Sequence, residues 1–192
     1  MEDFDITFHR KKVKHYSIRI DGDGTVHVTV PFSGTMREAE RFVKSKADWI
    51  LKKRQESLKR IPLDPATLRF HEGDAEYLTW MTEQIYPLFS SYRIPFPKLS
   101  FRVMKGRWGS CTKKKAEVTL NKLLKLLPKD CQEYVIAHEL SHLVEANHSK
   151  AFYAVLASVL PDYRERERKL DHFWIVRRGK VVKKYVDFGC GE

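Results

Sequence analysis

Near the amino terminus, apolar and polar residues alternate in two short runs, at positions 18–20 and 26–30. A period of two is typical of β-strands that bury one face. Residues 21–24 read Asp-Gly-Asp-Gly, which is rich in the residues that form tight turns. The pattern therefore predicts a β-hairpin over residues 18–30, and Pro31 ends its second strand.

A helical period follows the hairpin. Thr35 and Glu38 have the spacing of a capping box at a helix start. Apolar residues then recur at spacings of three and four, which predicts one amphipathic helix that runs to about residue 60. Residues 37–60 hold nine basic and four acidic side chains, so the outer face of this helix is expected to be strongly basic. The expected buried positions are Ala39, Phe42, Val43, Ala47 and Ile50.

Short strands and amphipathic helices make up the remainder of the predicted fold. A helix is predicted over residues 74–92, where Pro87 is expected to kink or interrupt it. Its expected inward residues are Tyr77, Leu78, Met81, Ile85 and Phe89. A strand is predicted at 99–104, with its return strand at 117–121. Three helices are predicted at 128–146, after Ser149 and at 162–171, and a terminal hairpin at 173–176 and 181–186.

The composition narrows the class of protein. Hydrophobic residues make up 42% of the 192 residues, which excludes a disordered or low-complexity chain. No apolar run approaches the roughly 20 residues of a membrane helix, and the acidic start lacks the apolar segment of a secretory signal. The three cysteines, Cys111, Cys131 and Cys190, are far apart, which argues against a disulfide framework. We therefore expect a cytoplasmic protein without a membrane partner.

The chain is strongly basic. Lys and Arg exceed Asp and Glu by 11, and the isoelectric point is about 9.6. Such an excess attracts polyanions, chiefly nucleic acid, but it is equally compatible with a solvated surface that keeps the protein soluble. If a nucleic acid binds, we expect the basic helix at 37–60 to make the main contact.

The segment His138-Glu139-Leu140-Ser141-His142 is an HExxH motif on a predicted helix. Residues four apart share one helical face, so the two histidines can bring their ring nitrogens to one metal ion. Glu139 lies one step around the helix and can reach a water on that ion without binding the ion itself.

A third histidine follows six residues after His142. Asn147 tolerates a left-handed backbone, so the chain can turn there and bring His148 to the same ion. Three histidines and a water form a catalytic zinc site with one open position. From composition alone, HExxH arises by accident in roughly 2% of such chains, and with the third histidine in about 0.1%. Two departures argue against a metzincin: Glu145 replaces the turn glycine, and no methionine follows His148.

Several short segments on both sides of the HExxH motif follow one another in a distinctive order. Residues 107–111 read Arg-Trp-Gly-Ser-Cys, followed by Leu120-Asn121, by Tyr-Val-Ile-Ala at 134–137 and by Asn-His-Ser at 147–149. This order resembles the YgjP-like metallopeptidase domain, which is related to the SprT-like zincins. The amino-terminal hairpin and the Ala-Asp-Trp-Ile segment at 47–50 are also similar to that family, so the resemblance covers roughly residues 10–60 and 85–170.

The resemblance implies an α+β fold, with a zincin-like metallopeptidase core and a small amino-terminal β-hairpin–helix unit. We expect three segments: residues 1–62 with the hairpin and the basic helix, residues 63–172 with the core, and a tail at 173–192. By position, the family implies zinc as the cofactor, His138, His142 and His148 as its ligands, and Glu139 as the catalytic acid/base.

For three residues near the motif, a functional and a structural role are both compatible with the sequence. Trp108 could line the active cleft, although an aromatic residue packed at a hairpin end is favoured. Cys111 could be a nucleophile or a ligand, but a small buried residue is favoured because no histidine adjoins it in sequence. Glu145 is either a partner of a ligand histidine or a solvated carboxylate.

Candidate residues for substrate contacts are less specific. Tyr153, Tyr163 and His172 could donate to an oxyanion, although a surface position is favoured for His172. Arg102 and Arg107 flank the predicted strand and are expected to bind solvent or a substrate carboxylate.

Together these features predict a zinc metallopeptidase that hydrolyses a peptide or protein substrate through an activated water, with Glu139 as general acid/base. We expect the strand at 99–104 or its partner at 117–121 to bind the substrate backbone. Three alternatives stay open: a nucleic-acid-binding protein with a structural zinc, a protease recruited to DNA-bound proteins, and a hydrolase of non-peptide amides.

Overall fold

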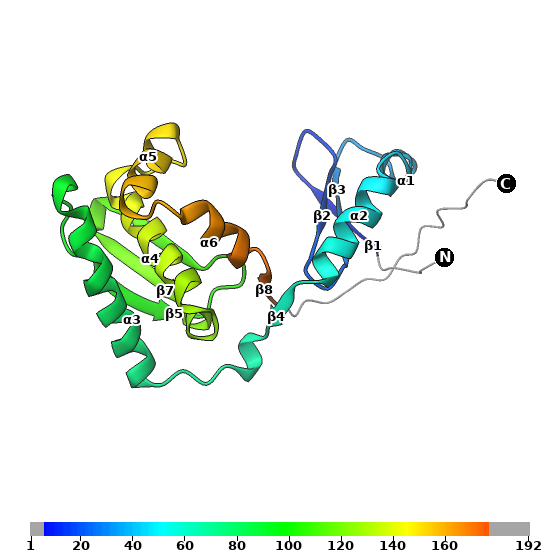
Figure 1. The fold of residues 1–192 in the computed structure, drawn as a ribbon. Coiled ribbons are helices and arrows are strands. Elements are labelled where there is room, and N and C mark those ends of the chain that lie inside the picture. Colours follow the sequence, from blue (N-terminus) through cyan, green and yellow to red (C-terminus); the bar gives the residue numbers. More distant parts are fainter. Residues whose placement is uncertain (1–5, 177–192) are drawn as a thin grey trace. The chain divides into compact units, whose positions relative to one another are not determined.

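The computed structural model describes residues 6–176. The chain divides into two compact units, whose described parts are residues 6–62 and 63–176 (Figure 1). Both helices and strands occur in each unit, so the protein is of mixed α and β class. No described helix is both long enough and apolar enough to span a membrane.

A three-stranded sheet forms the first unit together with two helices. Its strands are β1 (Ile6–Lys11), β2 (Ser17–Ile20) and β3 (Val26–Pro31), in the order β1-β3-β2. β2 and β3 pair antiparallel, which confirms the predicted hairpin, whereas β1 was not predicted and pairs parallel with β3. The buried core of the unit consists of Ile6, Val26, Val28, Val30, Ala39, Val43 and Ile50.

The prediction of one long helix after the hairpin is wrong. The segment forms α1 (Met36–Lys44), with the predicted capping box at Thr35, and α2 (Ala47–Leu58). At the break, the Ser45 hydroxyl donates to the Phe42 carbonyl at 2.8 Å, and such local bonds compete with the helical ladder. Phe42 and Ala47, expected to be buried, are only half-buried. The basic side chains are exposed except Arg54, which is half-buried, and Lys53 pairs with Glu56; that this surface binds nucleic acid stays a prediction.

The second unit contains a sheet of β5 (Lys98–Arg102), β6 (Gly109–Thr112) and β7 (Glu117–Asn121), in the order β5-β7-β6. The segment at 117–121 is therefore not an antiparallel return strand of the strand at 99–104, because β5 and β7 run parallel. The antiparallel partner of β7 is β6, which the sequence analysis missed. The strand predicted at 99–104 also ends at Arg102, before the loop that leads to β6.

Helices pack around this sheet. α3 (Glu72–Ile85) stops before Pro87, and residues Tyr86–Tyr92 continue as a 3-10 helix. Tyr77, predicted to face inward, is 40% exposed. The others are α4 (Lys129–Val144), α5 (Lys150–Val159) and α6 (Tyr163–Leu170), close to their predicted ranges. α4 is the central element: it contacts β6 and β7 and has α3, α5 and α6 as neighbours (Figure 1).

The described end of the chain forms one short strand. β8 (Phe173–Ile175) and β4 (Ile61–Leu63) make a two-stranded sheet, and the amide of Val176 donates to the carbonyl of Leu63 at 3.0 Å. The segment predicted as the second strand of a terminal hairpin, 181–186, lies outside the described residues.

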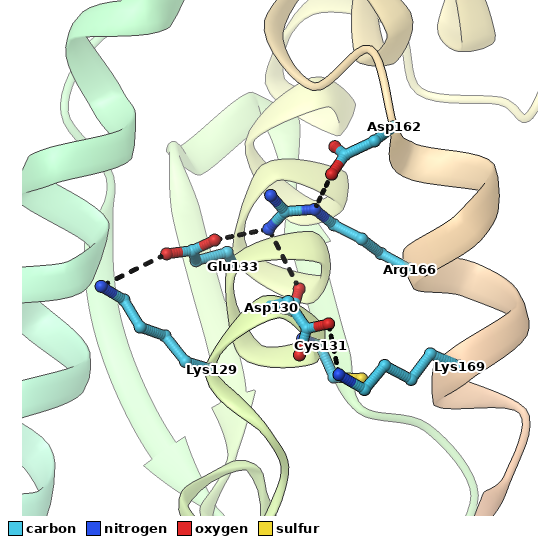
Figure 2. Close-up of polar contacts among 7 residues, drawn as sticks. All are labelled: Lys129, Asp130, Cys131, Glu133, Asp162, Arg166 and Lys169. Atoms are coloured by element: carbon cyan, nitrogen blue, oxygen red, sulfur yellow. Dashed lines mark hydrogen bonds and ion pairs between the residues drawn. The ribbon is translucent and has the colours of Figure 1, made fainter.

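A network of charged side chains joins α6 to the start of α4 (Figure 2). Arg166 is central: its Nε lies 2.9 Å from Asp162, and its Nη1 contacts both the Glu133 carboxylate and the carbonyl of Asp130, the latter at 3.3 Å. Lys169 pairs with the Asp130 carboxylate at 2.6 Å. We call Asp130, Glu133, Asp162, Arg166 and Lys169 the α4–α6 network; it fixes which face of α6 meets α4.

Replacing the central arginine tests this role. We expect Arg166→Gln to destabilise the second unit by about 1–3 kcal/mol, because two carboxylates and a carbonyl lose a partly buried partner. Lys129 is the matched control, since its exposed 3.8 Å contact with Glu133 is worth at most about 1 kcal/mol. Hydrogen exchange of the α4 and α6 amides measures both effects. Equal protection in Arg166→Gln and Lys129→Gln would contradict the expected role.

Candidate metal centre

Two of the three predicted metal ligands lie one turn apart on α4. The rings of His138 and His142 have centroids 4.9 Å apart. α4 ends at Val144, and the extended backbone of Glu145 (φ −131°, ψ 116°) starts the turn that returns the chain to the helix. This turn places Nε2 of His148 3.0 Å from Nε2 of His138. The structure therefore brings all three histidines together.

The arrangement fits a bound metal ion. One ring nitrogen of each histidine lies within 4.8 Å of the others. Nδ1 of His142 is 3.2 Å from the carbonyl oxygen of Glu145, so a proton on Nδ1 can be donated there and Nε2 keeps its lone pair for a ligand. Nδ1 of His138 is buried and has no hydrogen-bond partner among the described residues.

Burial favours the neutral form of the two imidazoles on α4, His138 and His142. It lowers the pKa of His138 to about 3, with smaller contributions from His142 and His148, and it also lowers the pKa of His142. A neutral imidazole has a free lone pair for a metal, whereas an imidazolium has none. Three neutral nitrogen donors are the ligand set of many catalytic zinc sites.

Glu139 lies beside these histidines and is only 6% exposed. Burial raises the pKa of its carboxyl to about 7, against the opposing effect of the Arg107 guanidinium. Gly109 of β6 covers the side chain: a Cβ on Gly109 would lie 2.5 Å from Cγ and Oε1 of Glu139. Only glycine leaves room for the carboxylate at this point, a requirement that the sequence analysis did not recognise.

A cleft of about 640 Å³ opens over the histidines. β6 forms one side of it, and the end of α6 with the first residue of β8 forms another. Besides the motif on α4, the lining includes Arg107, Trp108, Gly109, Cys111, Tyr134, Glu167, Leu170, Asp171 and Phe173. The cleft is therefore assembled from segments that are up to 66 residues apart in sequence, between Arg107 and Phe173.

Asn121 holds the loop that leads into β6. It is fully buried, and its Nδ2 donates to the carbonyls of Met104 and Arg107 at 2.8 and 2.9 Å. Its Oδ1 accepts from the amide of Leu123 at 3.2 Å, and its own amide donates to the carbonyl of Trp108 at 2.8 Å. These bonds tie the end of β7 to the loop and so position Gly109 over Glu139.

The residues around the Arg-Trp-Gly-Ser-Cys segment separate into those that reach the cleft and those that do not. Trp108 is half-buried; it lines the cleft and also packs against the core. Cys111 also lines the cleft. Burial, and to a smaller extent the charge of Glu139, raises the pKa of its thiol to about 11, so the thiol is protonated near neutral pH. Arg107 lines the cleft, whereas Arg102 is exposed on β5 and is not among the lining residues.

The other candidates have different positions. Glu145 contacts His142 through its backbone carbonyl rather than through its carboxylate. Tyr153 and Tyr163 are not among the described residues that line the metal cleft, and the Tyr163 hydroxyl accepts from Nε of Arg164 at 3.0 Å. His172 is exposed, with its Nδ1 2.9 Å from the Arg168 carbonyl.

Tyr134 is a cleft residue that the sequence analysis missed. It lies one turn before His138, with ring centroids 5.8 Å apart, and it is buried. Burial and the Glu167 carboxylate raise the pKa of its phenol, so its hydroxyl stays protonated as a donor. Its spacing of four from His138 is the signal that could have identified it.

Comparison with known proteins gives a family. The sequence pattern of the YgjP-like metallopeptidase domain matches residues 14–79 and 69–173. Two solved structures are similar, both titled metallopeptidase zymogens. Abylysin of Pyrococcus abyssi has 23% identity and a TM-score of 0.44, over 52% of this chain and 99% of its own. Jannalysin of Methanocaldococcus jannaschii has 23% identity and a TM-score of 0.41, over 47% and 93%. No curated protein matches.

The contact between Gly109 and Glu139 can be tested by adding one methyl group. We expect Gly109→Ala to displace the Glu139 side chain and to reduce stability by about 1–3 kcal/mol, as overpacking does, while the histidines keep their metal. Gly73→Ala is the matched control: nothing lies within 4 Å of its added Cβ, so it should be neutral or stabilising. Urea denaturation and a crystal structure measure both; an unmoved Glu139 would contradict the expectation.

Removing the third histidine tests the metal centre. We expect His148→Ala to lose zinc at least about tenfold more readily than the parent, because two imidazoles and waters hold the ion less well. His172→Ala removes an exposed histidine outside the cleft and should keep the parent's affinity. Zinc content after dialysis against a chelator series compares the three proteins. Equal retention by all three would place the third ligand elsewhere, with Glu145 as the first candidate.

Proposed function

Because the chain belongs to the YgjP-like metallopeptidase domain family, we propose that it is a zinc-dependent peptidase whose active site is the cleft over His138, His142 and His148. The observation that carries the proposal is the position of Glu139, a buried carboxylate beside three clustered imidazoles in an open cleft. A carboxylate in this position can act as the general base for a water at a metal centre.

The histidines would hold the ion through one nitrogen each, and the Glu145 carbonyl would keep His142 in the required tautomer. When bound, zinc lowers the pKa of a water and polarises the scissile carbonyl. A site with three protein ligands leaves room for that water.

Glu139 takes the proton of the attacking water and returns it to the leaving amine. Its burial suits this exchange, since a carboxyl with a pKa near 7 can both accept and release a proton at neutral pH. Gly109 keeps the side chain against the metal-binding face of α4, and Arg107 adds positive charge at the rim.

β6 is the strand that we propose binds the substrate backbone. The sequence analysis favoured 99–104 or 117–121, but β7 at 117–121 is paired on both sides, and β5 lies at the opposite edge of the sheet. β6 pairs with β7 on one side, and three of its residues, Gly109, Ser110 and Cys111, line the cleft. An extended peptide could add to its other edge and present a bond to the metal centre.

The substitution Glu139→Gln tests the mechanism. The amide is nearly isosteric but cannot accept the water's proton, so we expect peptide hydrolysis to fall about 10²- to 10⁴-fold while zinc content and stability are retained. Glu76→Gln, on the exposed side of α3, is the control for a loss of one negative charge. Digestion of a peptide library by the zinc-loaded proteins measures activity. Full activity in Glu139→Gln would remove this residue from the mechanism, and an inactive parent with firmly bound zinc would favour a structural metal.

A further inference from the structure

A second cleft lies beside the metal centre, between α5 and α6. It has a volume of about 800 Å³ and is lined by Lys150, Tyr153, Tyr163, Arg164, Glu167 and Arg168. Glu167 also lines the metal cleft, so the two clefts adjoin. The proposed mechanism uses none of the other five residues.

Two stacked tyrosines connect the second cleft to the metal centre. The rings of Tyr153 and Tyr163 have centroids 6.0 Å apart and are tilted by 27°. The Tyr153 ring centroid is also 6.4 Å from that of His148. An extended peptide advances about 3.3 Å per residue, so a substrate side chain about two to four residues from the scissile bond would reach this cleft.

The cleft carries three cations and one carboxylate. Among the described residues, no carboxylate lies within salt-bridge distance of Lys150, Arg164 or Arg168. Glu167 lines both clefts and its charge acts on Tyr134 as well as on Arg164, so this one carboxylate is shared between the two clefts. The second cleft is therefore positively charged, and its cations are available to a ligand.

The two arginines are exposed, and each makes a hydrogen bond within α6. Nε of Arg164 donates to the Tyr163 hydroxyl at 3.0 Å, and its guanidinium lies 5.7 Å from the centroid of the Tyr163 ring. Nε of Arg168 donates to the Arg164 carbonyl at 3.3 Å. Both hydrogen bonds use Nε, so the terminal nitrogens remain for a planar anion such as a carboxylate.

The opposite face of α6 has its cations paired. Arg166 and Lys169 belong to the α4–α6 network, where three carboxylates neutralise them (Figure 2). Arg164 and Arg168 are one turn apart and share the other face. The same helix thus has one basic face that is paired with carboxylates and one whose arginines form no salt bridge with a described residue.

We propose that the second cleft is a specificity subsite, which binds an acidic side chain, Asp or Glu, of a substrate peptide within about four residues of the scissile bond. This inference rests on the proposed peptidase function. Arg164 and Arg168 bind the carboxylate, Lys150 adds charge, and the two tyrosines hold the side chain's apolar part.

Cleavage-site profiling tests the subsite. The zinc-loaded parent should cleave a randomised peptide library with Asp and Glu enriched at one position within four residues of the cut. Arg164→Glu/Arg168→Glu should lose this enrichment or replace it with Lys and Arg. Lys98→Glu/Lys115→Glu makes the same change in net charge at exposed positions outside both clefts and should keep the parent's profile. A parent that cleaves without an acidic preference would overturn the subsite and leave the peptidase function standing.

A binding measurement separates this inference from the proposed function. Zinc-loaded Glu139→Gln protein should bind a fluorescent Glu-rich peptide at least about fivefold more tightly than its Gln-rich counterpart, and the Arg164→Glu/Arg168→Glu exchange should abolish the difference. Equal binding of the two peptides overturns the subsite even if the parent hydrolyses nothing. Tighter binding of single-stranded DNA or RNA that depends on Arg164 and Arg168 also overturns it, because the cleft would then be a phosphate-backbone site.

Discussion

The contact between Gly109 and Glu139 constrains the whole second unit. A carboxylate can be buried beside three imidazoles only if the strand above it approaches without a side chain, and a Cβ there would lie 2.5 Å from the Glu139 side chain. β6 must therefore be held close against the Glu139 side chain. Its pairing with β7 sets its position on one side, and Asn121 fixes the loop before it through the carbonyls of Met104 and Arg107.

The buried polar groups that make up the proposed active site also lower the stability of the fold. Burying the Glu139 carboxyl and part of the His138 ring costs free energy unless each polar atom finds a partner, yet Nδ1 of His138 is buried without one among the described residues. Burial also disfavours charge at the site, since it lowers the pKa of His138 and raises that of Glu139. The apolar packing around α4, from residues such as Leu140, Phe152 and Leu156, offsets that cost.

The sequence predicted those features that depend on interactions between residues close together in the chain. The β2–β3 hairpin, the capping box at Thr35 and the grouping of the three histidines follow from residues close together in the chain. The order of the second sheet did not, because β6 is only four residues long and its pairing joins segments that sequence periodicity does not relate. The need for glycine at 109 was hidden for the same reason, since its partner Glu139 lies 30 residues later.

The charged residues of α6 show how the fold sorts a pattern that the sequence leaves ambiguous. Residues 164–168 read Arg-Glu-Arg-Glu-Arg, which as a strand would place all three arginines on one side. As a helix, with about 100° per residue, it places Arg164 and Arg168 together and Arg166 on the far side. Asp130 and Glu133 of α4 hold that far side, so Glu167 reaches the metal cleft and the two remaining arginines reach the second cleft. A rotation of α6 would remove lining residues from both clefts at once, and the α4–α6 network therefore couples the stability of this helix to the shape of the proposed active site.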